Sequence, residues 1–240
     1  MIVTAYVRLE VRRTLRDTGF VFFGIGMPVV MYLLFTNLGT VDPEWKTASM
    51  VAMAAYGALG AALSTGTGVA EDKGVGWLRQ LRVTPMTPRQ AVTGRALTGS
   101  VVVLPAVAAV LAAGALVNGV RLDAWQWAAV VLALWLGALP FTLLGLGNGY
   151  RLSAQTTGLV NVSCNLLLSI VGGLWFPAAL FPQWLRTLSD FTPTHRFAEI
   201  GQQLAAGSAP GLAAPGVILA WALLFGSYAV FSYRRSARTV

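Results

Sequence analysis

Residues 96–118 read ALTGSVVVLPAVAAVLAAGALVN and contain no charged side chain. A helix needs about 20 mostly apolar residues to cross the roughly 30 Å hydrocarbon core of a bilayer. Because lipid offers the backbone no hydrogen-bond partners, a spanning segment must be a helix or part of a closed barrel. Barrel strands alternate between polar and apolar residues, and this stretch does not. It therefore predicts a membrane-spanning helix.

Further stretches of the same kind occur on both sides of it. Charged residues bound six long uncharged windows, which are residues 18–41, 47–70, 96–120, 124–150, 152–185 and 200–233. Each window is long enough for one span, and we place the spans at about 19–38, 48–70, 96–118, 124–150, 154–175 and 212–233. The sequence therefore predicts an all-α membrane protein with six transmembrane helices, forming a single transmembrane domain over residues 1–240.

The composition supports a membrane protein and argues against several soluble classes. Hydrophobic residues make up 56% of the chain and charged residues 11%, whereas a soluble domain is about 25% charged. The net charge of +8 does not indicate nucleic-acid binding, because the basic residues lie in short segments between apolar runs. One cysteine and one histidine are too few for a zinc or iron site, so we expect no bound metal.

The distribution of basic residues indicates the orientation. Of the 17 lysines and arginines, 13 lie in the N-terminal segment, between the second and third spans, after the fourth span or at the C-terminus. The positive-inside rule therefore puts both termini in the cytoplasm of a multi-pass protein of the cell (inner, cytoplasmic) membrane. Near the N-terminus an apolar stripe lies between arginines at helical spacing, and consists of Val3, Val7, Val11 and Leu15. It favours an amphipathic interfacial helix over a plain cytoplasmic tail.

The segment between the second and third spans predicts a helical elbow. Its first half has an apolar and a basic face, formed by Trp77, Leu78 and Leu81 and by Arg79 and Arg82 respectively. Pro85 ends this short helix, because a proline disfavours the helical conformation in the residue before it. Thr87 then caps a second helix that has Pro88 at its first position and runs through Arg95 into the third span. The elbow is either a docking element or an interfacial turn without a partner.

The segment before the last span is rich in proline and aromatic residues. Thr192 and Pro193 have the pattern of a helix cap followed by a first-turn proline. The pattern predicts two short amphipathic helices at the outer leaflet, a level at which aromatic residues often form an interfacial belt. The segment is either an anchor or an outer gate over a pathway, and the gate would consist of Pro177, Pro182, Trp184 and Pro193.

A few polar residues within the spans share faces. Asn161, Asn165 and Ser169 lie on one face of the fifth span, and Ser64 lies among small residues on one face of the second. In a membrane helix such groups face protein or water rather than lipid. They either hold helices together or line a translocation path at a dimer interface.

The sequence lacks a phosphate-binding loop for ATP. Such a loop places a lysine directly after a glycine, so that the lysine reaches the β- and γ-phosphates. Lys46 and Lys73 are the only lysines, and neither follows a glycine. We therefore expect no ATP hydrolysis by that route and no cofactor on this chain. Gly145 and Gly149 lie at the end of a span as a small-xxx-small pair, which predicts close helix packing.

Two motifs resemble the membrane subunit of a type-2 ATP-binding-cassette (ABC) transporter, a permease group that includes bacterial drug and polysaccharide exporters. The first is Glu71…Gly74…Leu78…Leu81…Pro85, which resembles the coupling-helix region of that family. The second is Gly172-Gly173…Pro177…Pro182…Pro193 before the last span. The six spans, the amphipathic N-terminal helix and the cytoplasmic ends complete the resemblance, which covers essentially the whole chain.

The resemblance implies a permease paired with a second permease subunit, as a homodimer or heterodimer. It also implies a separate nucleotide-binding ATPase subunit that carries ATP and magnesium. The residues that would couple to this subunit are Glu71, Gly74, Trp77, Leu78, Arg79, Leu81, Arg82 and Pro85. An uncharged, mildly polar path favours export of a lipophilic or amphipathic compound, such as a drug or natural product.

Three alternatives stay open. The first is an integral-membrane enzyme that acts on lipids at the outer leaflet through His195, Arg196 and Glu199. The second is an exporter of a lipid-linked glycan, and the third is a structural subunit of a membrane complex. Co-purification with an ATPase separates a permease from an enzyme. ATP turnover that a substrate stimulates separates it from a structural subunit.

Overall fold

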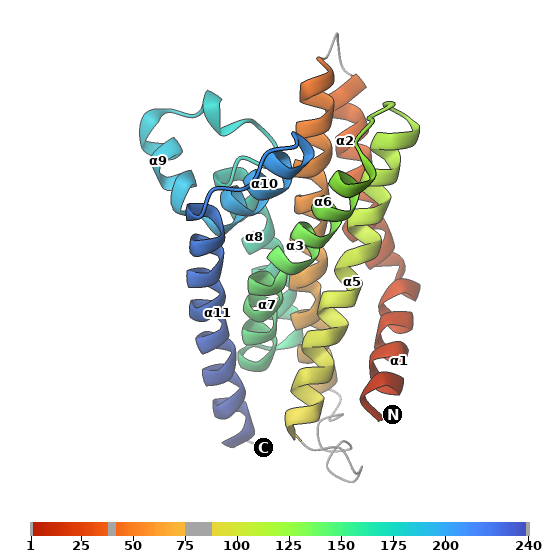
Figure 1. The fold of residues 1–240 in the computed structure, drawn as a ribbon. Helices are drawn as coiled ribbons and strands as arrows, with labels where there is room; N and C mark the ends of the chain where they lie inside the picture. Colours follow the sequence, from red (N-terminus) through yellow and green to blue (C-terminus); the bar gives the residue numbers. More distant parts are fainter. Residues whose placement is uncertain (1, 38–41, 75–87, 239–240) are drawn as a thin grey trace.

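The computed structural model describes residues 2–37, 42–74 and 88–238, and Figure 1 shows it as a bundle of long helices. Every regular element in these ranges is helical. In chain order the elements are α1 (Ile2–Arg16), η1 (Phe20–Gly26), α2 (Met27–Asn37), α3 (Pro43–Gly74), α5 (Pro88–Leu116), α6 (Ala124–Gly137), α7 (Leu139–Arg151), α8 (Ala154–Val171), η2 (Ala178–Leu180), α9 (Gln183–Phe191), α10 (Pro193–Ala205) and α11 (Ala213–Arg238).

Six helical stretches among the described residues are long and apolar enough to cross a membrane. They are Phe20–Asn37, Pro43–Gly74, Gly94–Leu116, Ala124–Arg151, Ala154–Val171 and Ala213–Ser236. The prediction of an all-α membrane protein with six spans is therefore confirmed. The second span is longer at both ends than the sequence indicated, and it includes the charged residues Glu71, Asp72 and Lys73.

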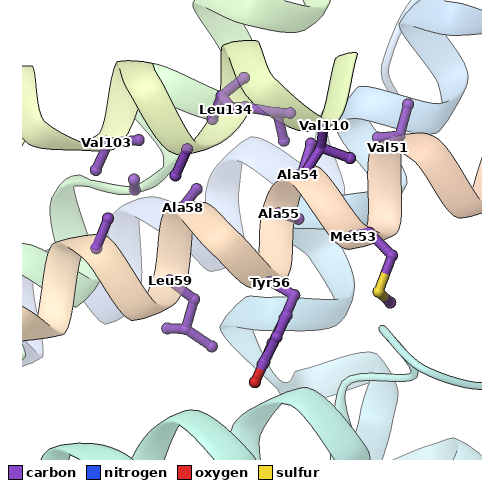
Figure 2. Packing of buried hydrophobic residues seen from close by; sticks show 14 of the residues in the cluster. Val51, Met53, Ala54, Ala55, Tyr56, Ala58, Leu59, Val103, Val110 and Leu134 are labelled. Carbon is purple, nitrogen blue, oxygen red and sulfur yellow. The ribbon is translucent and has the colours of Figure 1, made fainter. Parts of the chain in front are cut away.

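Helix α3 lies at the centre of the bundle and packs against α2, α5, α7, α8 and α10. It can do so because alanine, glycine and serine dominate its middle, and small side chains let neighbouring helices approach closely. Figure 2 shows part of this core, where Ala54, Ala55 and Ala58 of α3 pack near Val110 of α5 and Leu134 of α6. The most buried helix of the bundle is thus the one that leads into the predicted elbow.

Helices α3 and α7 meet at their backbones. A Cβ atom added at Gly66 would overlap the carbonyl oxygen of Gly145, and one added at Gly149 would overlap the carbonyl oxygen of Gly66. A Cβ atom at Gly145 would lie 2.7 Å from the carbonyl oxygen of Leu63. The prediction of close packing at Gly145 and Gly149 is therefore confirmed, and Gly66 is its counterpart on α3.

Two spans contain local breaks with identifiable causes. The first span begins with the π-helical segment η1, and Pro28 lies in the first turn of α2 that follows; a proline lacks the N–H for a regular i to i−4 bond and its ring clashes with the carbonyl group four residues before it. The fourth span divides at Ala138, where α6 ends and α7 starts with Pro140 in its first turn. The fifth span ends at Val171, and Gly173 then takes a positive φ of 74°. Its helix is therefore shorter than the predicted 154–175.

Different segments of the chain lie at the two ends of the bundle. Figure 1 places both termini at one end, together with the C-terminal end of α7 and the N-terminal end of α5. The predicted second helix of the elbow exists, because α5 runs from Pro88 through Arg95 into the third span. Helices α9 and α10 lie towards the opposite end, and α11 then returns along the outside of the bundle beside α7.

Candidate functional site

A cavity of about 1010 Å³ lies on the side of α3 that faces α1, η1, α5 and α8. Its polar wall includes Ser64, Asn161 and Asn165, three of the four residues predicted to line a path. Phe23 of η1 also lines it and is 69% exposed, so the cavity reaches the apolar outer surface of the bundle. Arg12 and Arg16 of α1 form a basic rim at the end where the chain begins. The cavity is thus bounded by polar, apolar and charged groups, and the charges have both signs, since Glu10, Asp17 and Glu71 also line it.

The fourth predicted path residue, Ser169, has a different environment. It lies on α8 two turns beyond Asn161, its side chain is fully buried, and it is not part of the wall of this cavity. Its hydroxyl has no hydrogen-bond partner among the described residues. The structure therefore brings three of the four predicted residues together at one cavity.

Asn161 joins three helices. Its Nδ2 donates to the carbonyl oxygen of Leu63 at 2.9 Å and to the hydroxyl of Thr67 at 3.2 Å, both on α3. Its Oδ1 accepts from Asn148 Nδ2 of α7 at 2.9 Å, and Asn148 in turn accepts from the Tyr228 hydroxyl of α11 at 3.0 Å. This buried network holds helices together, which is one of the two roles expected for Asn161.

Asn165 lies one turn further along α8 and is less constrained. Its Nδ2 lies 3.2 Å from the place where a Cβ atom of Gly60 would stand, so the amide group packs directly on α3. Its Oδ1 has no hydrogen-bond partner among the described residues, although it is shielded from solvent. An unpaired amide oxygen in a cavity wall is costly unless something else supplies a donor. Asn165 is therefore the better candidate for contact with a transported molecule.

Four charged residues form an ion-pair network at the cavity, and three of them are buried. Arg95 of α5 pairs with Glu10 of α1, with Nη1 and Oε2 2.7 Å apart, and also with Asp72 of α3. Asp72 Oδ1 also pairs with Arg13 Nη1 of α1 at 3.0 Å. Glu10, Asp72 and Arg95 are each less than 10% exposed. Such burial is tolerated because every charge has an opposite partner.

The sequence did not reveal this network. The four residues lie 85 positions apart at most, in three different segments, and each looks like an ordinary cytoplasmic charge. A usable signal was present in their position, since each lies within about three helical turns of a predicted span. Only the packing of α1 against α5 and of α3 against α5 brings them together.

Lys73 makes a second set of contacts at the end of α3. Its ammonium group donates to the carbonyl oxygens of Gly149, Tyr150 and Leu152, at 3.3, 3.0 and 2.7 Å. The last carbonyl groups of a helix have no partners within the helix, and a lysine there satisfies them and complements the helix dipole. Lys73 therefore caps the C-terminal end of α7.

The predicted coupling residues are described only in part. Glu71 is exposed on the last turn of α3 and lines the cavity. Gly74 ends that helix, is exposed, and has open space where a Cβ atom would stand. The other six lie outside the described residues, and they are Trp77, Leu78, Arg79, Leu81, Arg82 and Pro85.

The segment before the last span forms the two short helices that the sequence predicted. Thr192 caps α10, its hydroxyl accepting from the backbone N–H of His195 at 3.4 Å, and Pro193 is the first residue of that helix. Of the other predicted gate residues, Pro177 precedes η2, Pro182 precedes α9, and Trp184 is 69% exposed. A smaller cavity of about 320 Å³ lies beneath this segment and includes Pro177 in its wall.

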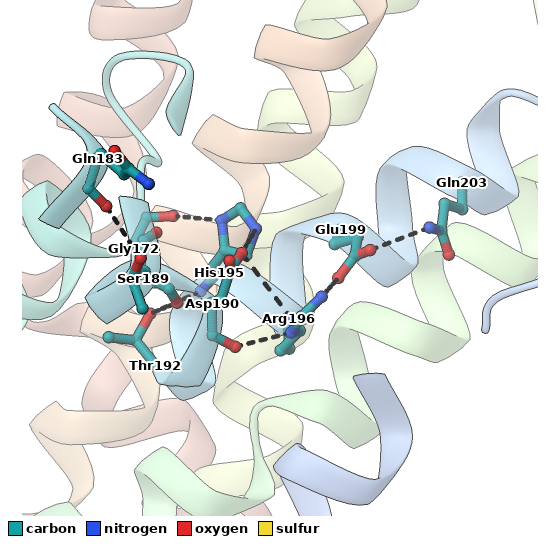
Figure 3. Close-up of polar contacts among 10 residues, drawn as sticks. Gly172, Gln183, Ser189, Asp190, Thr192, His195, Arg196, Glu199 and Gln203 are labelled. Carbon is teal, nitrogen blue, oxygen red and sulfur yellow. Dashed lines mark hydrogen bonds and ion pairs between the residues drawn. The ribbon is translucent and has the colours of Figure 1, made fainter. Parts of the chain in front are cut away.

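The three residues of the proposed lipid enzyme are tied to their neighbours. Figure 3 shows His195 between the carbonyl oxygen of Gly172, 3.3 Å from Nδ1, and Asp190, 3.6 Å from Nε2. Arg196 pairs with Glu199 at 2.7 Å and donates to the backbone carbonyl of Asp190 at 2.8 Å. These contacts link α8, α9 and α10, and they give each side chain a structural role.

Comparison with known proteins defines the family. The family model described as "ABC-2 type transporter" matches residues 3–204, which is most of the chain. This chain belongs to the ABC-2 type transporter family. Among curated proteins, it is 25% identical over 221 residues to the "Putative transport permease YvfS" of Bacillus subtilis (strain 168), a match covering 90% of each chain. The resemblance noted in the sequence is thereby confirmed.

Membership of the ABC-2 family decides between the broad functional classes. The chain is a transmembrane permease, a transport subunit rather than an enzyme, and it belongs to an ABC transporter that has a partner ATPase. The alternative of a lipid-modifying enzyme is therefore set aside, in agreement with the structural role of His195, Arg196 and Glu199. The cavity beside α3 is the candidate site of transport in this permease.

Proposed function

We propose that this ABC-2 permease exports a lipophilic or amphipathic compound, which it takes up from the inner leaflet into the cavity beside α3. One observation carries the proposal. A single cavity borders the exposed aromatic Phe23, the basic rim of Arg12 and Arg16, and the amides of Asn161 and Asn165. An amphipathic molecule needs an apolar surface for its tail and polar groups for its head, and these residues supply both.

The direction of movement follows from the proposed orientation. The positive-inside distribution puts the termini, and therefore the mouth of the cavity at α1, on the cytoplasmic side. A molecule that enters there would leave towards α9 and α10, where Pro177, Pro182, Trp184 and Pro193 form the proposed outer gate. Export of a drug or natural product fits an entrance at the inner leaflet.

The proposed complex contains two permease subunits and two copies of the ATPase. Large apolar side chains are exposed on η1, α8 and α11, and each of these surfaces must face lipid or another protein. The faces of η1 and α8 flank the cavity, so a second permease subunit there would close it from the side. The ATPase would dock on residues 75–87, through Trp77, Leu78, Arg79, Leu81 and Arg82.

The docking half of the proposal is tested by purification. We expect the tagged permease, extracted from its own membranes, to bring with it a P-loop ATPase with measurable ATP turnover. Leu81→Asp should abolish this co-purification without affecting membrane insertion, because a carboxylate cannot be buried in an apolar cleft. Leu212→Asp is the matched control, since Leu212 is 92% exposed in the connection between α10 and α11. Equal co-purification of both variants would refute the docking role.

The transport half is tested in inside-out vesicles that contain the complex. A lipophilic fluorescent dye and a short-chain fluorescent phospholipid serve as probes. We expect ATP-dependent accumulation of at least one of them, and we expect it to change in Asn165→Leu, since that amide oxygen lacks a partner among the described residues. ATP-dependent movement of a lipid-linked oligosaccharide, with none of either probe, would show that the glycan alternative is correct.

A further inference from the structure

Two consecutive residues near the start of the predicted coupling region contact different parts of the permease. Asp72 and Lys73 are consecutive in the last turn of α3, which ends at Gly74. Successive residues on an α-helix are separated by about 100° around its axis, because a turn contains 3.6 residues. The two side chains therefore contact different neighbours, although both move with the end of α3.

Asp72 connects α3 to one wall of the cavity. It pairs with Arg95 of α5 and with Arg13 of α1, and Arg95 pairs in turn with Glu10 of α1. Asp72 is 3% exposed and Arg95 7%, so the pairs of Arg95 with Asp72 and Glu10 are shielded from water and from screening by salt, whereas the Arg13 side chain is 57% exposed. Arg12, on the same helix as Glu10 and Arg13, lines the cavity. A displacement of Asp72 would therefore displace the α1 wall.

Lys73 connects α3 to the opposite wall. Its ammonium group holds the carbonyl oxygens of Gly149, Tyr150 and Leu152 at the end of α7. Only Leu152 and Ser153 separate α7 from α8, and Ser153 caps α8 by accepting from the N–H of Thr156 at 3.4 Å. Helix α8 carries Gly158, Asn161 and Asn165 into the cavity wall. A displacement of Lys73 would therefore act on the N-terminal end of α8, in addition to the direct contacts between α3 and α8 at Asn161.

We propose that Asp72 and Lys73 form a branch point that divides the movement of the coupling segment between the two walls of the cavity. Asp72 is the positioning residue for α1, and Lys73 is the positioning residue for α8. This inference rests on the proposed function, because it assumes that a partner ATPase moves residues 75–87. It goes beyond that function by assigning the movement of α1 to Asp72 and the movement of α8 to Lys73.

The experiment measures both walls separately in the complex of the permease with its co-purifying ATPase. In a Cys164→Ala background, Arg12→Cys reports on α1 and Gly158→Cys reports on α8. Both positions line the cavity, Arg12 is exposed, and a Cβ atom at Gly158 would meet nothing within 4 Å. The measured quantity is the rate of labelling by a water-soluble maleimide, with and without trapping by ATP and vanadate.

We expect trapping to change the labelling rate at both cysteines in the parent protein. Lys73→Met should remove the response at Gly158→Cys and keep the response at Arg12→Cys. Asp72→Asn should remove the response at Arg12→Cys and keep the response at Gly158→Cys. Lys73→Arg should restore the response at Gly158→Cys, because a guanidinium also donates to carbonyl oxygens. Lys46→Met, at the other end of α3, is the control and should change neither response.

Measuring both substitutions at both cysteines distinguishes a positioning role from a general loss of structure. If Lys73→Met and Asp72→Asn each abolish both responses, or each leave both intact, the branch point is refuted. If the parent complex binds its ATPase but neither cysteine responds to trapping, the proposed function fails and this inference fails with it. Retained ATP turnover in both variants is required, since a lost ATPase would indicate a defect in docking instead.

Discussion

At the scale of single residues, the buried charges of this permease depend on one arginine. Arg95 is 7% exposed and pairs with both Glu10 and Asp72. Removing one member of a buried ion pair leaves an uncompensated charge, which is far more costly than losing an exposed pair. Replacing Arg95 should therefore lower the free energy of unfolding more than replacing any other member of this network.

We predict that Arg95→Met destabilises the folded permease by about 3–5 kcal/mol, because two buried carboxylates lose their shared partner. Thermal unfolding in detergent micelles measures the effect. Arg12→Met is the matched control, since Arg12 is an exposed arginine of the cavity rim. An unfolding temperature of Arg95→Met equal to that of the control would contradict the assigned role of the network.

The two asparagines of α8 should behave differently. Asn161→Leu removes bonds to Leu63, Thr67 and Asn148, so we predict a loss of about 1–3 kcal/mol for each buried group left unsatisfied. Asn165→Leu removes an unpaired oxygen, so we predict near-normal stability and altered transport. Unfolding temperature and dye uptake, measured on both variants, distinguish the roles. Equal destabilisation of both variants would show that both residues hold helices together.

At the scale of helices, the contact of α3 with α7 sets the geometry of the bundle. Gly66 and Gly145 let two backbones touch, and this contact lies two turns before Lys73 on α3. Lys73 then caps the end of α7. The two helices are therefore joined by backbone packing at Gly66 and Gly145 and by hydrogen bonds from Lys73 to the end of α7.

We predict that Gly66→Ala destabilises the permease by at least about 1–3 kcal/mol, because its Cβ atom would overlap the Gly145 carbonyl and the helices would have to separate. Gly158→Ala is the control, since its Cβ atom would occupy open space on α8. The unfolding temperatures of the two variants in micelles test this. If Gly66→Ala unfolds at the same temperature as Gly158→Ala, the contact is looser than the structure shows.

At the scale of the whole molecule, the arrangement of the bundle ends determines how the permease sits in the membrane. Both termini lie at the same end, as an even number of spans requires, and α9 and α10 lie towards the other. Which end of the bundle faces the cytoplasm is inferred from the basic residues alone, because lysine and arginine are enriched in the cytoplasmic segments of membrane proteins.

We predict that a membrane-impermeant maleimide applied to intact cells labels Leu212→Cys and not Arg12→Cys, in a Cys164→Ala background. Leu212 is 92% exposed and lies between α10 and α11, and Arg12 is exposed on α1. Permeabilised cells provide the control, because both cysteines should then react. Labelling of Arg12→Cys alone in intact cells would invert the proposed orientation and rule out export as described.

The site was predictable only in part, as the residues of α8 show. Asn161 and Asn165 were recognised because a polar amide within an apolar run must face protein or water. Their different roles were not predictable, since these depend on whether Leu63, Thr67 and Asn148 lie within hydrogen-bond distance. Glu10, Asp72 and Arg95 were missed for the same reason, because their partners lie on other helices.

The sequence by itself determined that this membrane protein has six helices long and apolar enough to cross a membrane, because the absence of water in lipid forces each long uncharged run into a helix. It also determined the caps at Thr192 and Pro193, which depend on neighbouring residues alone. Tertiary structure decided which side chains meet, such as Lys73 with the end of α7 and Arg95 with Glu10. Lipid favours every apolar helix face about equally, so the arrangement of the helices depends on small residues and buried polar contacts between segments far apart in the chain.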